Sequence, residues 1–104
     1  MSERIRVAAA EQVPTGEALR VVVAGVPIAL FHVGEEFFAI NDTCSHAEAS
    51  LSEGEVSDHE VTCPKHGSRF DLRTGRPKGL PAYRPVQVYP IEVSDGALYI
   101  TWEG

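Results

Sequence analysis

Two short segments, Cys44-Ser45-His46 and Cys63-Pro64-Lys65-His66, decide how the rest of the sequence is interpreted. They contain both cysteines and two of the four histidines of the 104-residue chain, and sixteen residues separate them. Two thiolates and two imidazoles form a complete ligand set either for one tetrahedral zinc ion or for an iron–sulfur cluster held by two cysteines and two histidines. The two segments therefore predict a metal centre, with these four side chains as its candidate ligands.

The spacing of the candidate ligands favours a cluster over a single ion. Structural zinc sites usually have two to four residues between paired cysteines and three to five between paired histidines. Only Ser45 lies between Cys44 and His46, and in extended chain this places the two Cα atoms roughly 6–7 Å apart. This spacing suits delivery to two different iron ions, the thiolates binding one and the imidazoles the other. A structural zinc site in an interaction module is the alternative.

The sequence on either side of the two segments is typical of β-structure. Apolar and β-branched runs bounded by turn residues predict strands at residues 18–24, 27–33, 37–40, 86–89, 91–93 and 97–102. No apolar pattern has helical spacing, and residues 8–12 could form one turn at most. Residues 41–81 are polar and rich in turn formers, which in a small domain usually marks a functional insert. We predict one all-β domain over residues 1–104, with a base of 1–40 and 82–104 and a metal-binding subdomain of 41–81.

Composition and charge exclude several classes of protein. Nine Lys and Arg against fifteen Asp and Glu give a net charge of −6, which disfavours nucleic-acid binding. Gly25 and Pro27 interrupt the longest apolar run, which is far shorter than the roughly 20 residues of a membrane span. The sequence shows no export signal, and two cysteines are too few for a disulfide framework. We therefore expect a cytoplasmic location without membrane or nucleic-acid partners. Since no nucleophile elbow, phosphate loop or second metal motif is present, we expect no catalytic residues.

The two segments, together with the following Gly67 and Ser68, resemble the cluster-binding boxes of Rieske [2Fe–2S] proteins. The similarity continues through Arg69-Phe70-Asp71, Thr74-Gly75 and Gly79-Leu80-Pro81-Ala82 to the final strands, and so covers most of the chain. It implies the Rieske fold, in which three antiparallel sheets carry an inserted cluster-binding subdomain. It also implies one Rieske [2Fe–2S] cluster per subunit.

The resemblance implies a role for each residue of the boxes. Cys44 and Cys63 would bind the buried iron, and His46 and His66 would bind the outer iron. The residues that would surround the cluster are Gly67, Ser68 and Pro81. The extra cysteines of respiratory and photosynthetic Rieske subunits are absent, because residues 47–49 are Ala, Glu and Ala and residue 65 is Lys.

Among Rieske proteins the chain is most similar to the soluble ferredoxins of bacterial ring-hydroxylating dioxygenases, such as the ferredoxin component of biphenyl dioxygenase. This similarity implies a carrier, not an enzyme, that takes one electron from an NAD(P)H-dependent flavoprotein reductase to a terminal non-haem iron oxygenase. The small Rieske subunit of assimilatory nitrite reductases is the second possibility. Lys65 and Arg69 lie beside the implied ligands and could steer an acidic patch on a partner.

Charge and hydrogen bonding predict the reduction potential. Two thiolates leave an oxidised cluster neutral, whereas four leave it with two negative charges, so Rieske potentials run from about −150 to +300 mV, against about −400 mV for plant-type ferredoxins. Ser68 matches a serine that donates to a bridging sulfide in high-potential relatives. Phe70 stands where those relatives have a tyrosine that donates to a cysteine sulfur. With that donor lost, we expect a potential in the lower part of the Rieske range.

Overall fold

The computed structural model describes residues 2–44, 49–65, 67–78 and 84–103. In these ranges the chain forms strands and two short 3-10 helices, η1 (Ala10–Gln12) and η2 (Leu51–Glu53). The strands are β1 (Glu3–Ala9), β2 (Ala18–Val23), β3 (Val26–Val33), β4 (Glu36–Asn41), β5 (Glu55–Ser57), β6 (Glu60–Thr62), β7 (Arg69–Asp71), β8 (Val88–Tyr89), β9 (Ile91–Ser94) and β10 (Ala97–Trp102). No helix in the described ranges is long and apolar enough to span a membrane.

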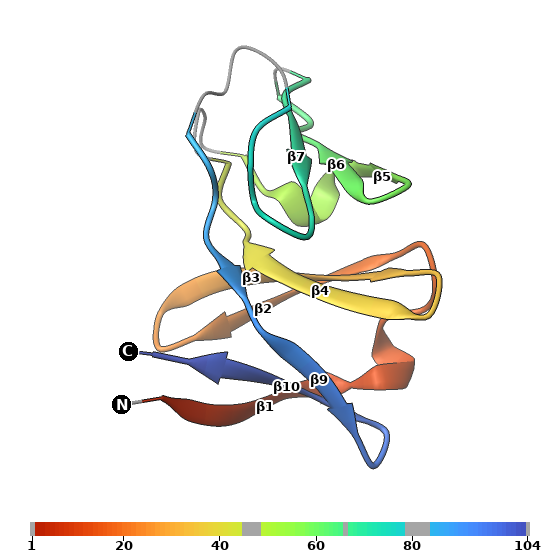
Figure 1. Cartoon of the computed structure of the whole chain (residues 1–104), viewed down its shortest axis with the longest axis vertical. Coiled ribbons are helices and arrows are strands. Elements are labelled where there is room, and N and C mark those ends of the chain that lie inside the picture. Colours follow the sequence, from red (N-terminus) through yellow and green to blue (C-terminus); the bar gives the residue numbers. More distant parts are fainter. Residues whose placement is uncertain (1, 45–48, 66, 79–83, 104) are drawn as a thin grey trace.

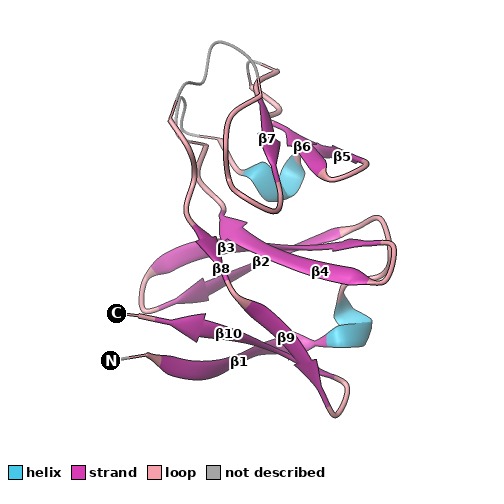
Figure 2. Cartoon of the chain, viewed as in Figure 1, coloured by secondary structure: helices cyan, strands magenta, loops and turns pink. Residues whose placement is uncertain are grey.

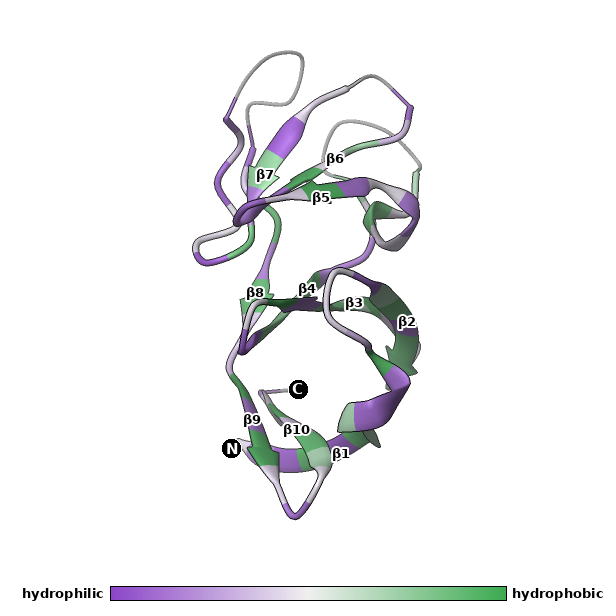
Figure 3. Cartoon of the chain, turned by 90° about the vertical axis from the view of Figure 1, so that its right-hand side faces the viewer, coloured by the Kyte–Doolittle hydropathy of each residue, from purple (hydrophilic) through white to green (hydrophobic). Residues whose placement is uncertain are grey.

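The strands form three antiparallel sheets (Figure 1; Figure 2). The first sheet has the order β1-β10-β9, the second β2-β3-β4-β8 and the third β5-β6-β7. Figure 3 shows them as successive layers, with the third sheet at one end of the molecule. The prediction of an all-β fold with three antiparallel sheets is confirmed, and the third sheet lies entirely within residues 41–81.

Two tight hairpins follow from the turn residues. Ala24 and Gly25 both have positive φ, 51° and 82°, between the paired residues Val23 and Val26. A two-residue hairpin turn with positive φ at both positions matches the twist of the flanking strands. Asp95 and Gly96 form the same kind of turn, with φ of 51° and 75°, between β9 and β10. The six strands predicted from the sequence are present, with ends within two residues of those expected.

The second sheet is buried on both faces. Successive side chains of a strand point to opposite faces of its sheet. On β3, Ala29 and Phe31 pack in a core shared with the third sheet, whereas Ile28 and Leu30 pack in a core shared with the first sheet. All four side chains are fully buried. β3 therefore connects the cores on both sides of it.

The first sheet brings the two ends of the chain together. Glu3 pairs with Trp102 across β1 and β10. Figure 1 shows both ends on the side of the molecule remote from the third sheet. β1, β5, β6 and β7 are not among the strands that the sequence pattern predicts, and the helical turn allowed at residues 8–12 is the 3-10 helix η1.

Candidate metal centre

The two cysteines follow two different strands, and their side chains are buried in the same core. Cys44 follows β4 after two residues, and Cys63 directly follows β6. Their side chains are 4% and 1% exposed, and both belong to the core that the second and third sheets share. They form no disulfide with each other. Both thiols are thus buried in one apolar environment.

Backbone hydrogen bonds close the loop of the first box. The N–H of Cys44 donates to the carbonyl of Ala49 at 3.0 Å, and Thr43 forms an isolated β-bridge with Ser50. Cys44 and Ala49 are therefore held beside each other. His46, a predicted ligand, lies outside the described residues.

Backbone hydrogen bonds also connect the described residues of the second box. The N–H of Cys63 donates to the carbonyl of Ser68 at 2.6 Å, and the N–H of Gly67 donates to the carbonyl of Cys63 at 3.0 Å. Gly67 has a φ of 75°, a conformation that glycine adopts without steric cost. Ser68 is buried, 1% exposed. His66 and Pro81 lie outside the described residues.

Asp42 is a buried acid that the sequence analysis does not single out. Its carboxylate accepts hydrogen bonds from the N–H of Ser52 at 2.8 Å and from Nε of Arg20 at 3.2 Å. Its backbone carbonyl accepts the N–H of Leu51 at 2.7 Å. Asp42 therefore ties the first box to η2 and to β2. An acid two residues before a candidate ligand is the signal that could have found it.

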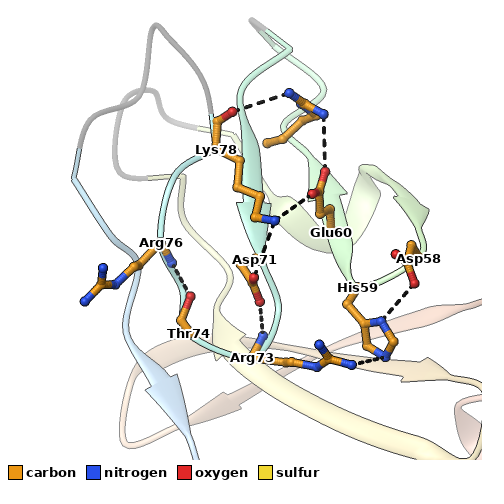
Figure 4. Close-up of polar contacts among 9 residues, drawn as sticks. Asp58, His59, Glu60, Asp71, Arg73, Thr74, Arg76 and Lys78 are labelled. Atoms are coloured by element: carbon orange, nitrogen blue, oxygen red, sulfur yellow. Dashed lines mark hydrogen bonds and ion pairs between the residues drawn. The ribbon is translucent and has the colours of Figure 1, made fainter.

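A network of charged side chains joins the third sheet to the segment that follows it (Figure 4). Nζ of Lys78 lies 3.1 Å from one carboxylate oxygen of Glu60 and 3.8 Å from one of Asp71, and Arg69 lies 3.4 Å from the other oxygen of Glu60. The hydrogen bond between Lys78 and Glu60, and the attraction of the Glu60 carboxylate, raise the pKa of Lys78 above its ordinary value. The network fixes residues 76–78 against β6 and β7, immediately before the segment that contains Pro81.

The remaining two histidines have other partners. His32 Nδ1 lies 2.8 Å from the carbonyl oxygen of Val13, and its ring stacks on Phe37 at 4.0 Å. His59 Nδ1 lies 2.9 Å from the carboxylate of Asp58, and Arg73 lies 3.1 Å from its Nε2. Both histidines therefore have partners outside the two boxes.

The donor chemistry of the described residues fits an iron–sulfur cluster. Within those residues no three His, Cys, Asp or Glu side chains gather as a metal site, and two of the four predicted ligands lie outside them. The described pair is two thiols in a core with Leu51, Val61 and Phe70. Soft thiolates select iron–sulfur clusters or zinc, and an apolar shell excludes water from such a centre. The fold and the two boxes thus define an all-β protein whose two cysteines lie in the core shared by the second and third sheets.

The family model of the Rieske [2Fe-2S] domain matches residues 3–90. The chain therefore belongs to the Rieske [2Fe–2S] family, and its cofactor is a Rieske [2Fe–2S] cluster. The expected family and cofactor are confirmed, which sets aside the zinc alternative.

Known ferredoxins are similar to the chain over nearly its whole length. The 3-phenylpropionate/cinnamic acid dioxygenase ferredoxin subunit of Escherichia coli K12 is 49% identical over 98 residues, covering 93% of this chain and 92% of the relative. A chain in the complex of reduced oxygenase and oxidized ferredoxin of carbazole 1,9a-dioxygenase has a TM-score of 0.88 and 39% identity, covering 93% of this chain and 91% of its own. These relatives confirm the expected class, an electron-carrying ferredoxin of the dioxygenase type and not a catalytic oxygenase.

A nitrite reductase protein shares only the fold. The NADH-dependent nitrite reductase small subunit from Mycobacterium tuberculosis has a TM-score of 0.88 but 22% identity, covering 100% of this chain and 98% of its own. Identity this low shows common architecture and nothing about the reaction served.

Proposed function

We propose that this protein takes one electron from an NAD(P)H-dependent flavoprotein reductase and delivers it to a terminal non-haem iron oxygenase. The observation that carries the proposal is the 49% identity to a dioxygenase ferredoxin subunit over 93% of the chain. The solved complex of a similar ferredoxin with its oxygenase supports the second step. We also propose a cytoplasmic location, in keeping with two cysteines that form no disulfide with each other.

Four residues of the two boxes would hold the cluster in this proposal. Cys44 and Cys63 would bind one iron, since both thiols are buried in the shared core. His46 and His66 would bind the other iron, as membership of the Rieske family implies. The cluster supplies reversible one-electron storage. The protein contributes the water-excluding core around the thiols and the backbone turns that fix each box.

The remaining predicted residues would adjust the centre. The hydrogen bond from the N–H of Cys63 to the carbonyl of Ser68 holds Ser68 beside the buried cysteine. The positive φ of Gly67 permits the turn between these two residues. Hydrogen bonds to cluster sulfurs raise the reduction potential of such centres. Gly67, Ser68 and Pro81 are therefore proposed neighbours of the cluster. We also propose that residues 41–81 act as the cluster-binding subdomain on a base of 1–40 and 82–104.

The ligand assignment can be tested with a histidine-to-cysteine exchange. His66→Cys replaces a neutral ligand by a thiolate, so the midpoint potential of the variant should fall strongly. His59→Cys is the matched control, because it adds a cysteine to the same insert at a histidine with other partners, and it should leave the potential unchanged. Voltammetry and the paramagnetic-resonance spectrum of the reduced protein give both readouts. An unchanged potential in a His66→Cys protein that retains its cluster would contradict the assignment.

A variant that loses the cluster provides the second test. Cys63→Ser removes a buried thiolate, and the anaerobically purified variant should lack iron, acid-labile sulfide and visible colour. Wild-type protein should have two irons and two sulfides per chain, as a [2Fe–2S] centre requires. Full cluster content in Cys63→Ser would exclude Cys63 as a ligand.

The nitrite reductase role is the second candidate, supported by shared fold alone. The two roles differ in the partner. The nitrite reductase role requires a sirohaem protein, whereas the dioxygenase role requires a non-haem iron oxygenase. Co-purification of the tagged protein from its native cells with a sirohaem protein would favour the second candidate.

A further inference from the structure

Positive charge is concentrated in a short part of this acidic chain. Residues 65–84 contain six of the nine Lys and Arg residues and a single acid, Asp71, for a net charge of +5. The rest of the chain has three basic and fourteen acidic residues, a net charge of −11. The segment that starts at the second cluster box therefore has the opposite sign to the rest of the protein.

Five basic residues of this segment are exposed, and they are here called the basic strip. All of them are exposed, and Arg69 and Lys78 retain about half of their side-chain exposure, 54% and 44%, despite their ion pairs. The members of the basic strip are Lys65, Arg69, Arg73, Arg76 and Lys78.

The carboxylates near the basic strip are too few to neutralise it. Glu60 is shared between Arg69 and Lys78, and Asp71 forms an ion pair with Lys78 alone. Arg73 contacts His59, whose ring nitrogens lie 2.9 Å from Asp58 and 3.8 Å from Glu36. In the described ranges, Lys65 and Arg76 form no ion pair. Figure 4 shows the Arg76 side chain directed away from the network of Glu60, Asp71 and Lys78. The strip therefore presents surplus positive charge to solvent.

The basic strip lies at the cluster-bearing end of the molecule. Lys65 is part of the second box, two residues after Cys63, and Arg69 begins β7 of the third sheet. Arg73 lies two residues after the end of β7, and its neighbour His59 also contacts Asp58 (Figure 4).

We propose that the basic strip is the docking surface for an acidic patch on the terminal oxygenase. This inference rests on the proposed function. The oxygenase is the partner because a similar ferredoxin, 39% identical, occurs in a complex with its oxygenase. Charge complementarity accelerates the encounter of two proteins and orients it, and salt screens the effect. The strip gives the acidic ferredoxin a surface near the second cluster box that attracts an acidic patch.

The local field can be measured without any protein partner. Reduced protein is mixed with anionic hexacyanoferrate(III), which accepts the single electron that the cluster loses, and no proton is transferred. If the strip governs the approach, the rate falls as ionic strength rises, although the protein has a net charge of −6. Cationic tris(phenanthroline)cobalt(III) should show the opposite dependence. A hexacyanoferrate(III) rate that rises with salt would overturn the proposal.

Charge-reversal variants show which residues produce the electrostatic attraction. Arg76→Glu and Lys65→Glu should each slow the hexacyanoferrate(III) reaction about three- to tenfold at low ionic strength, and less at high ionic strength. Arg6→Glu is the matched control, because it makes the same change in net charge on exposed β1 and should leave the rate nearly unchanged. The reduction potentials are measured alongside, so that a change in driving force is not mistaken for a change in field. Equal slowing by all three variants would contradict a local strip.

The partner is tested with the terminal oxygenase and the reductase of the 3-phenylpropionate dioxygenase of Escherichia coli K12. Arg76→Glu should slow reduction of the oxygenase and weaken its salt dependence, while reduction of the ferredoxin by the reductase is unchanged. Slowing of the reductase step alone would overturn the choice of partner. If wild type reduces the oxygenase and Arg76→Glu does so equally well, the strip is wrong and the proposed function stands. If wild type reacts with hexacyanoferrate(III) but reduces no oxygenase, both the partner and the proposed function are contradicted.

Discussion

Asp42 shows how a single polar residue fixes the entrance to the first cluster box. Its carboxylate is 1% exposed, yet both oxygens have partners, the N–H of Ser52 and Nε of Arg20. A buried hydrogen-bonding group that loses its partner pays the full cost of leaving water. The connection between Asp42 and Ser52 therefore holds η2 beside the residues that precede Cys44.

Removing this carboxylate should destabilise the protein. Asp42→Ala leaves the N–H of Ser52 without its acceptor, and we expect a loss of about 1–3 kcal/mol in the free energy of unfolding. Asp42→Asn keeps one acceptor and should lose less. Urea unfolding followed by circular dichroism gives the values, with Glu17→Gln, an exposed change of similar charge, as the control. Equal stability of Asp42→Ala and Glu17→Gln would show that the bonds contribute nothing.

Gly75 is required for two separate reasons. Its φ is +76°, and a Cβ built there would collide with the carbonyl oxygen of Val86. Gly16 has a similar φ of +86° but open space around its Cβ position. Gly16→Ala should therefore cost about 1–2 kcal/mol for conformation alone. Gly75→Ala should cost at least about 1–3 kcal/mol more, because backbone must move. Thermal unfolding of both variants measures the difference, and equal losses would exclude the collision.

Phe70 offers a test of the hydrogen-bond control of potential. The side chain is fully buried in the core that contains Cys44 and Cys63. In Phe70→Tyr, a hydroxyl that donates to a cysteine sulfur should raise the midpoint potential by several tens of millivolts. Wild-type protein should lie in the lower part of the Rieske range, below about +150 mV. Phe38→Tyr is the control, since Phe38 packs at the margin of the core. A lower potential in Phe70→Tyr would contradict the expected donor.

At the scale of single residues, the sequence predicts the candidate ligands of the site better than the residues that hold those ligands in place. The two boxes can be identified because cysteine and histidine have few roles at such spacing in a small protein with two cysteines. The role of Gly75 depends on Val86, and that of Asp42 depends on Arg20 and Ser52. These partners lie ten or more residues away in the sequence, so no local pattern could indicate them.

At the scale of elements, the contrast between hairpins and the third sheet is informative. The β2–β3 and β9–β10 hairpins are predicted because alternating apolar residues flank glycine-containing turns. β5, β6 and β7 are three residues long, and each has one apolar residue between polar ones. Val61 pairs with Val56 on one side and Phe70 on the other. A period of two cannot be recognised in three residues, so only the assembled sheet reveals this apolar row.

The ion pairs between these short strands predict a pH dependence at the alkaline end. The pKa of Lys78 is raised above 10.5 by Glu60 and, less strongly, by Asp71. Because the raised value belongs to the folded state, the contribution of Lys78 is fully present below its unfolded pKa and is lost as pH rises through the folded pKa. Wild type should therefore be more stable than Lys78→Gln at about pH 9, and the difference should shrink by about pH 12.

Unfolding curves collected across this range provide the measurement. Lys65→Gln is the matched control, since Lys65 forms no ion pair in the described ranges and should show no such convergence. A constant difference between wild type and Lys78→Gln at every pH would exclude the ion pairs as its source.

At the scale of the whole molecule, the order of the sheets depends on contacts between distant parts of the chain. β1 pairs with β10, and β4 pairs with β8 across the whole insert. The sequence predicts most of the strands and, through family resemblance, the number of sheets. Which strands lie next to each other within a sheet cannot be predicted from local turns, because the first strand, β1, pairs with the last strand, β10.

The two cores should respond differently to cavities. Leu98 lies in the core between the first and second sheets and Leu51 in the core with the cysteines, and both are fully buried. Each change to alanine should lower the free energy of unfolding by about 2–5 kcal/mol. Only Leu51→Ala should also speed loss of the cluster below the unfolding temperature, measured as bleaching of visible absorbance in the presence of a chelator. Equal bleaching rates would show that the first core also protects the cluster.

The pairing of Glu3 with Trp102 also determines how the protein can be handled. Both ends of the chain emerge together, remote from the third sheet (Figure 1). An affinity tag, a fused protein or an electrode linker attached at either end would leave the redox-active face outward. Immobilised in this way, the carrier should exchange electrons with soluble partners while it is attached at the end remote from the third sheet.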